Sequence, residues 1–432
     1  MSTPGGELST VRRVFLISHG DCRGILVRSP PQSHPDAIVT EQTTPPARTR
    51  QRDPRLDFFR GLALWFIFVD HIPSNIINWL TIRNFGFSDA TEIFIFISGY
   101  SAAMAYSGTL RRQGFFFAAA RILHRCWQLY IAHIFLFVIF TAQIAYVAAH
   151  YSNPMYVEEM NVTHFVDAPH IALIEALLLR FRPANMDVLP LYIFLLVAFP
   201  VVLWAMQRRP VAVLGAAVLL YATARVMHWN LQAYPPDEVW FFNPFTWQLL
   251  FVLGALCGGA RDAMMPLCRW RVWAAVIAAG YLAASFCVVM TWHISRLDGA
   301  LPNWLNRALY PIDKTNLDML RLAHFLALAY ITAKLVRPDA RFLSWRWLQP
   351  VLVCGRHSLY VFCFGIYLSF AAYFVLSQVN GSIAMQVAIS IAGIAAMTAL
   401  AYLLSWYAAQ QAKSKYMTAA PPRPADREES KS

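Results

Sequence analysis

The sequence predicts an all-α protein, a polytopic membrane bundle of about ten transmembrane helices. Apolar stretches of about 20 residues, the length that crosses a hydrocarbon core of about 30 Å, recur along the whole chain. Hydrophobic residues make up 58% of the 432 residues and charged residues only 14%, whereas a soluble domain has about a quarter charged residues. Lys and Arg also gather in alternate connections between the apolar stretches, as in proteins oriented in a membrane.

Polar or proline-containing stretches bound the predicted spans. A shorter amphipathic stretch at 170–181 is expected to lie flat at the membrane interface. Disordered cytoplasmic tails are expected at 1–52 and 412–432, on either side of a membrane domain at 53–411. The predicted spans lie near 54–80, 89–107, 122–149, 187–206, 210–227, 243–260, 272–292, 318–336, 356–378 and 383–410.

The basic residues predict the orientation of the spans. The even-numbered connections carry most of the Lys and Arg, which places them and both termini in the cytoplasm. The longer connections 150–186, 228–242 and 293–317 then face outward. The net charge of +12 therefore reflects orientation, and no nucleic-acid motif is present. The seven cysteines form no CxxC pair, so neither a disulfide framework nor a metal site is expected.

The first predicted span carries ionisable residues at its start and inside it. Asp53 and Pro54 make a favourable helix start, with the aspartate as N-cap. Arg60 and His71 are eleven residues apart, which places them on nearly the same helix face and about 16 Å apart along the axis. If Arg60 marks the inner boundary, Asp70 and His71 lie near the middle of the bilayer.

Such deep ionisable groups are costly and usually functional. The alternative is a neutral His71 bonded to a neighbouring helix, with Asp70 paired to an arginine elsewhere. Two adjacent titratable groups favour function, and imidazole is the side chain best suited to take a proton near neutral pH.

Arg60 and His71 resemble the R-x10-H motif in the first helix of membrane acyltransferase family 3. The run EIFIFISGY at 92–100 is similar to the second helix of that family. RILHRCWQLY at 121–130 resembles the basic start of its third helix, although the usual proline is absent. Members of the family move acyl groups onto extracytoplasmic sugars.

The OpgC family gives a closer resemblance. It implies a protein of the bacterial inner membrane that transfers succinyl groups from succinyl-CoA, a co-substrate and not a resident cofactor, to periplasmic glucans. The acyl group and the exact envelope glycan stay open. The segments that carry the resemblance are RDPRLDFFRGLAL, FVDHIP, NFGFSDATEIFIFISGYSAAMAY, VLPLYIFLL, FFNPFTWQLLFVLGA and GRHSLYVFC.

The cytoplasmic side offers basic residues for a coenzyme A donor. Arg121 and Arg125 stand one turn apart on one helix face, where guanidinium groups suit phosphates. Asp57, Arg356 and His357 lie on the same side and are also assigned to the donor. The alternative for these cations is ordinary positive-inside charge.

The outward side offers residues for a glycan acceptor. Ser88, Asp89 and Glu92 precede or begin the second span, where a capping box alone explains the two carboxylates. In FFNPFTWQ, aromatic rings and amides suit a sugar, and the alternative is an interfacial aromatic belt. The residues assigned to the acceptor from this segment and the 293–317 loop are Asn243, Trp247, Gln248 and Lys314.

Together these features predict a membrane O-acyltransferase. His71 is expected to act as general base, oriented by Asp70 or an outer carboxylate, and Arg60 to bind the donor. The rival hypothesis is a transporter that uses Asp70 and His71 as a proton relay. A membrane scaffold without catalytic activity has no use for a buried pair of ionisable residues. The oligomeric state, and the choice between direct transfer and an acyl-enzyme, stay open.

Overall fold

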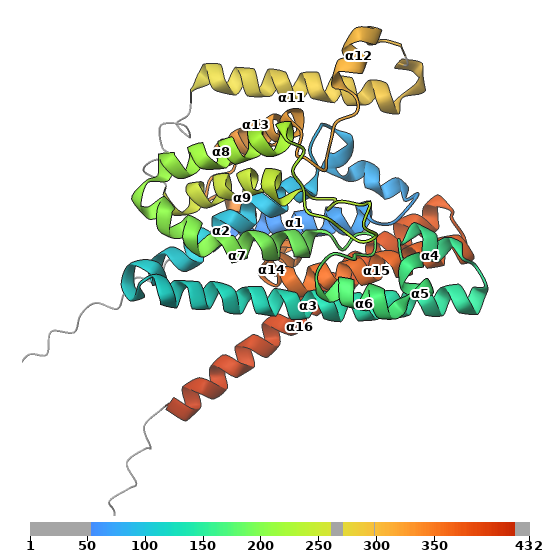
Figure 1. Cartoon of the computed structure of the whole chain (residues 1–432), viewed down its shortest axis with the longest axis horizontal. Helices are drawn as coiled ribbons and strands as arrows, with labels where there is room; N and C mark the ends of the chain where they lie inside the picture. Colours follow the sequence, from blue (N-terminus) through green and yellow to red (C-terminus); the bar gives the residue numbers. More distant parts are fainter. Residues whose placement is uncertain (1–52, 261–270, 298, 420–432) are drawn as a thin grey trace, which may run out of the picture. The chain divides into compact units, whose positions relative to one another are not determined.

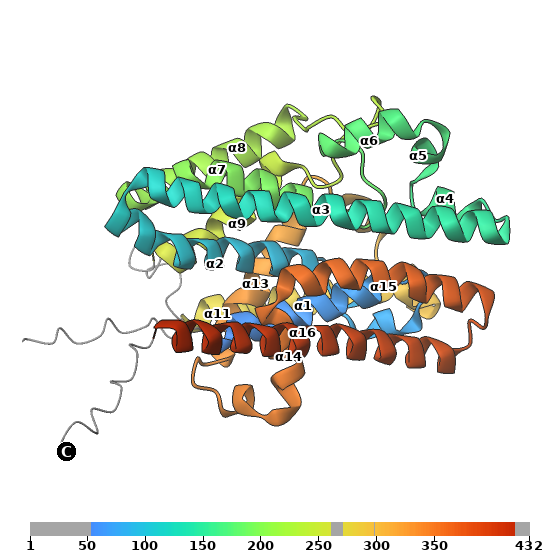
Figure 2. The same ribbon diagram turned by 90° about the horizontal axis from the view of Figure 1, so that it is seen from below.

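A computed structural model describes residues 53–260, 271–297 and 299–419, which fold as helices with one isolated β-bridge between Gln232 and Val239. The predicted tail at 1–52 and the last residues of the predicted tail at 412–432 lie outside the described residues. The longer helices run side by side, and α4, α5 and α6 lie together at one end (Figures 1 and 2). The helices are α1 Pro54–Asp70, α2 Ala90–Gln113, α3 Phe115–Tyr151, α4 Met155–Glu159, α5 Thr163–Asp167, α6 Pro169–Leu177, α7 Val188–Arg208, α8 Pro210–Val226, α9 Pro244–Gly259, α11 Val272–His293, α12 Asn303–Leu309, α13 Met319–Leu335, α14 Gln349–Arg356, α15 Ser358–Gln378 and α16 Ile383–Ala419, with short 3₁₀ turns at Ile76–Leu80, Ile82–Asn84, Ser295–Leu297, Arg341–Ser344 and Arg346–Leu348.

Each predicted span overlaps one of these helices, but the number of membrane crossings is not confirmed. Six described helices are long and apolar enough to cross a membrane: α2, α3, α7, α11, α15 and α16. α8 and α9 are shorter apolar helices, and α1 and α13 have 17 residues each. The structure therefore supports a helical membrane protein with several spans, and ten crossings remain a prediction.

The first predicted span is shorter than expected. α1 begins as predicted, with Asp53 accepting a hydrogen bond from the Arg55 backbone N–H and Pro54 in the first turn. It ends at Asp70 instead of continuing to residue 80. Pro73 explains the early end, because proline disfavours helical backbone in the residue before it and has no N–H to donate. Asp70 and His71 thus lie at a helix terminus and not within a longer helix.

Two other boundaries also differ from expectation. α16 continues to Ala419, beyond the predicted domain end at 411. The segment predicted to lie at the interface, 170–181, forms α6 and ends at Leu177. Because both differences fall at helix ends, the order of the helices is unchanged.

Glycines let two central helices approach closely. Gly99 of α2 lies against the backbone carbonyl of Phe251 on α9, and Gly254 of α9 lies against that of Phe96 on α2. A Cβ atom at either position would clash with backbone, which cannot swing aside as a side chain can. Small residues at such crossings are typical of membrane helices, where close packing replaces the hydrophobic driving force.

We expect Gly254→Ala to destabilise the protein by about 1–3 kcal/mol, because the new methyl group overpacks the crossing of α2 and α9. Gly280→Ala on α11 is the matched control, since nothing lies within 4 Å of a Cβ atom there. The control should be neutral or stabilising by up to about 1 kcal/mol, because alanine favours helix. Thermal unfolding in detergent micelles measures both variants. Equal unfolding temperatures for the two would contradict the proposed crossing.

Candidate functional site

A cavity of about 1010 Å³ lies at the end of the bundle where the predicted outward connections meet. Its wall includes residues from 180–188, 233–242 and 289–315, so the three long connections converge there. The volume is at the upper end of the range for ligand sites. The residues assigned to chemistry or the acceptor that line this outer cavity are Asp70, His71, Ser88, Asp89 and Lys314.

His71 is held by the backbone of its own helix. Its Nδ1 lies 2.6 Å from the carbonyl oxygen of Ile67. A carbonyl only accepts, so Nδ1 must carry the hydrogen, and the lone pair of the neutral ring is on Nε2. The imidazole is therefore fixed in the tautomer that a general base with Nε2 requires.

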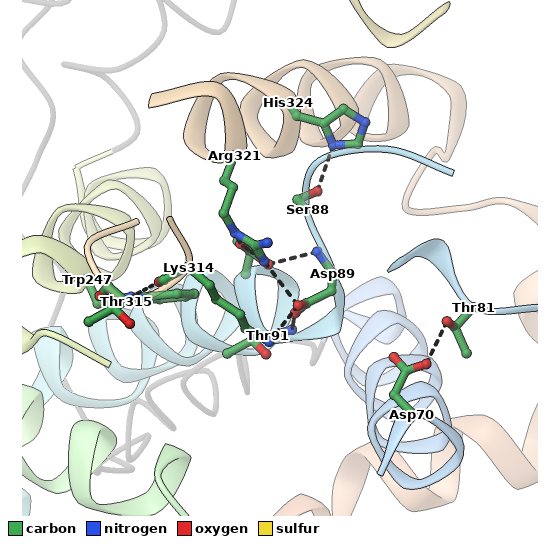
Figure 3. Close-up of polar contacts among 11 residues, drawn as sticks. Asp70, Thr81, Ser88, Asp89, Thr91, Trp247, Lys314, Thr315, Arg321 and His324 are labelled. Atoms are coloured by element: carbon green, nitrogen blue, oxygen red, sulfur yellow. Dashed lines mark hydrogen bonds and ion pairs between the residues drawn. The ribbon is translucent and has the colours of Figure 1, made fainter. Parts of the chain in front are cut away.

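Neither Asp70 nor a carboxylate of the second helix supplies the orienting bond to His71 that the sequence led us to expect. Asp70 Oδ1 instead accepts a hydrogen bond from the Thr81 hydroxyl at 2.7 Å (Figure 3). This bond ties the end of α1 to the 3₁₀ turns that follow it. Asp70 thus shapes the cavity wall beside His71, and within the described part of the chain no hydrogen bond joins its carboxylate to the imidazole.

A cluster of two carboxylates and two cations lies beside the cavity, and Asp89, Lys314 and Arg321 of this cluster line its wall. Figure 3 shows these three side chains pointing toward one another. The predicted capping box is present: Asp89 caps α2, and the Glu92 side chain bonds the Asp89 backbone N–H at 2.9 Å. Both carboxylates also form ion pairs. Arg321 of α13 lies 2.7 Å from Glu92 and 3.0 Å from Asp89, and Lys314 lies 2.7 Å from Asp89.

Asp89 is buried beside both Lys314 and Arg321, and these two cations stabilise its ionised form. Glu92 is fully buried, so it depends on Arg321 as its partner. The sequence reasoning missed Arg321, although a cation inside a predicted apolar span is a signal for a buried partner.

His324, one turn beyond Arg321 on α13, is a second residue that the sequence reasoning missed. Its Nδ1 lies 2.8 Å from the Ser88 hydroxyl, and both side chains are buried (Figure 3). The contact ties the loop before α2 to α13. Ser88 thus contributes to the cavity wall from a fixed position.

Four residues assigned to the acceptor do not line the described cavity: Glu92, which is fully buried against Arg321, and Asn243, Trp247 and Gln248. Asn243 is fully buried, caps α9 and donates from Nδ2 to the Trp229 carbonyl at 2.6 Å. Trp247 is also fully buried and its Nε1 donates to the Lys314 and Thr315 carbonyls at 3.2 Å. Gln248 donates to the Ala217 carbonyl at 2.8 Å. These polar groups hold the framework, and other rings face the cavity: Phe87, Tyr234, Trp240, Phe241, Phe242, Trp292 and Tyr310.

A second, smaller pocket of about 170 Å³ lies further along the bundle. Arg60 of α1 and Arg125 of α3, two residues assigned to the donor, both line it. The Arg60 Nη2 lies 2.6 Å from the Ser101 hydroxyl, and Arg125 bonds the Gln128 side-chain oxygen at 3.0 Å. No carboxylate lines this inner pocket in the part of the chain that the structure describes. Its charge is therefore suited to an anion.

The other residues assigned to the donor lie outside the inner pocket and connect helices. Arg121 donates to the Thr109 hydroxyl at 2.8 Å. Arg356 lies 3.7 Å from the buried Asp57, an ion pair between α14 and α1. His357 Nε2 lies 2.8 Å from the Ser405 hydroxyl of α16.

We expect Arg321→Met to destabilise the protein by about 3–5 kcal/mol, because it leaves Glu92 as an unpaired buried charge. Thermal unfolding in detergent micelles measures the loss. Arg337→Met is the matched control, since its ion pair with Asp339 is mostly exposed and such pairs contribute about 0–1 kcal/mol. Equal stability of the two variants would show that the cluster does not hold α13 against α2.

No solved structure and no curated protein matched this chain. The family model described as OpgC protein matches residues 52–409. Since that range covers most of the chain and both cavities, the chain belongs to the OpgC family.

Proposed function

We propose that the protein is a membrane O-acyltransferase that moves an acyl group from a coenzyme A thioester to a hydroxyl of a periplasmic or other envelope glucan. One observation carries the proposal. α1 presents Arg60 to a basic inner pocket and His71 to a large outer cavity, so one helix connects an anion site to a base. Membership of the OpgC family supports a glucan-modifying membrane transferase, and a succinyl group is the acyl unit that the resemblance implies.

The outer cavity fits a carbohydrate acceptor. Its volume of about 1010 Å³ accommodates several sugar rings, and its wall combines charged groups with aromatic rings. Aromatic faces such as Trp240 and Tyr310 stack on the apolar faces of sugars, while Asp89 and Lys314 bond hydroxyl groups. The glucan enters from the side of the long outward connections.

The inner pocket fits the donor. Arg60 and Arg125 attract the phosphates or an acyl carboxylate of the thioester, and charge-assisted hydrogen bonds are about twice as strong as neutral ones. Both arginines belong to helices whose connections are basic at this end, which is the predicted cytoplasmic side. The donor therefore reaches the transfer site from the opposite compartment to the glucan.

Transfer needs one proton acceptor. Nε2 of His71 takes the proton of the glucan hydroxyl as its oxygen attacks the thioester carbonyl. The carbon–sulfur bond breaks as the ester bond forms, and the imidazolium returns the proton to the departing thiolate. The products are the O-acyl glucan and free coenzyme A, so no further reactant is required.

Replacing His71 with Ala should lower glucan acylation by about 10²–10⁴-fold, the usual contribution of a general base. Mass spectrometry of envelope glucans from cells with each variant measures the acylation, and an immunoblot of membranes verifies protein level. His170→Ala, an exposed histidine at the start of α6, is the matched control. Full acylation by the His71 variant would refute the assignment. Proton-dependent flux of a substrate without any acyl product would instead support a transporter.

Replacing Arg125 with Met should raise the KM for acyl-CoA about tenfold or more, because a charge-assisted hydrogen bond contributes about 1.5–3 kcal/mol. The acceptor KM should stay unchanged, since Arg125 lines only the inner pocket. Steady-state kinetics of the purified protein in lipid nanodiscs measure both constants. Arg112→Met, at an exposed position near the end of α2, is the control for loss of general positive charge. An unchanged KM for acyl-CoA would contradict the proposal that the donor binds in this pocket.

A further inference from the structure

The two cavities lie very close together along the bundle. On α7, Val188 lines the outer cavity and its neighbour Leu189 lines the inner pocket. On α2, Thr91 lines the outer cavity and Phe94 the inner pocket. Three residues are about one helical turn, a rise of about 4.5 Å. The two spaces are thus separated by about one layer of side chains.

Aromatic rings form much of that layer. Phe94 of α2 and Phe362 of α15 stack with ring centroids 5.9 Å apart, and Phe94 meets Tyr192 of α7 edge-on at 6.5 Å. Phe94 is 4% exposed and Phe362 is 2% exposed. All three rings line the inner pocket and none lines the outer cavity. We call these three residues the ring partition.

The positions of Phe94 and Phe362 along their helices place these two rings at the end of the inner pocket that is nearer the outer cavity. α2 starts at the outer cavity, and Phe94 is its first residue that lines the inner pocket. α15 starts beside the inner pocket, and Phe362 is its last residue that lines this pocket. Both rings therefore mark the limit of the inner pocket toward His71.

Acyl transfer requires that this limit be crossed. The attacking oxygen and the thioester carbonyl must come within about 3–3.5 Å of each other, yet Arg60 lines the inner pocket and His71 the outer cavity. Helix backbones in a packed bundle move together, whereas a phenylalanine ring moves aside by rotation about two side-chain bonds. The rings are accordingly the elements that open most readily.

We propose that Phe94 and Phe362 form a movable partition between the two cavities. When the rings move aside, the acyl thioester reaches His71; when they are closed, water of the outer cavity cannot reach the thioester. The proposal rests on the proposed acyltransferase function and adds residues that control the path of the acyl group. Water exclusion matters because water competes with the glucan hydroxyl. In that side reaction water attacks the carbonyl, the carbon–sulfur bond breaks, and a free acid and free coenzyme A form.

The test measures thiol release from succinyl-CoA and from acetyl-CoA, each without glucan, by the full-length protein in lipid nanodiscs. Phe362→Leu and Phe94→Leu should raise this glucan-independent hydrolysis at least tenfold relative to the unaltered protein, because a smaller side chain leaves the partition open. Phe370→Leu is the matched control. Phe370 lies two turns further along α15, is 1% exposed, packs on Phe140 and Tyr156, and lines neither cavity.

A bulkier variant provides a second measurement that does not depend on removing atoms from the core. Phe362→Trp should slow transfer to glucan, and more for succinyl-CoA than for acetyl-CoA, without raising hydrolysis. Thermal unfolding verifies that each variant is folded.

Two results would overturn the partition. In the first, glucan-independent hydrolysis by both leucine variants equals that of the Phe370 control while transfer stays intact. In the second, the tryptophan variant transfers both acyl groups at the unaltered rate. Failure of the proposed function is distinct, because the unaltered protein would then form no acyl glucan from either thioester with glucan present, and that result overturns both proposals.

Discussion

The pairing of Arg321 with Asp89 and Glu92 is the constraint on which the outer cavity depends. Glu92 is fully buried and Arg321 is 9% exposed, so neither charge has enough water to replace its partner. α13 must therefore lie against the start of α2. Lys314 extends the cluster into the loop before α13, and Trp247 holds the same loop through the Lys314 carbonyl. A polar network thus fixes one wall of the cavity.

The inner pocket is built differently. Hydroxyl groups and two arginines line it, and its limit toward the outer cavity consists of rings in van der Waals contact. Ion pairs and hydrogen bonds have strict geometry, whereas ring packing tolerates rotation at modest cost. The bundle therefore combines a rigid wall around the proposed base with a deformable boundary behind it, which is what transfer between two compartments requires.

Local signals in the sequence predicted much of this arrangement. Hydrophobic runs located every long helix, Asp53 and Pro54 marked the start of α1, and the spacing of Asp89 and Glu92 predicted the capping box. Pairings between distant segments were not predictable in the same way. Arg321 meets Glu92 across 229 residues of sequence, and nothing local distinguishes the buried amides of Asn243 and Gln248 from amides that face a ligand. Prediction therefore succeeded for helices and failed for the partners of their polar residues.

The early end of α1 connects one of those local signals to the chemistry. Pro73 stops the helix at Asp70, so His71 takes the C-cap position and its backbone leaves the helical conformation, with φ −93° and ψ 4°. The Ile67 carbonyl accepts from the backbone N–H of His71 at 3.1 Å and from its Nδ1 at 2.6 Å. That second bond places the ring hydrogen on Nδ1, so the lone pair is on Nε2, which is the atom the proposed transfer uses. The proline two residues beyond His71 thus ends the helix at the residue whose side chain turns back to the Ile67 carbonyl, and that contact decides which nitrogen of His71 acts as the proposed base.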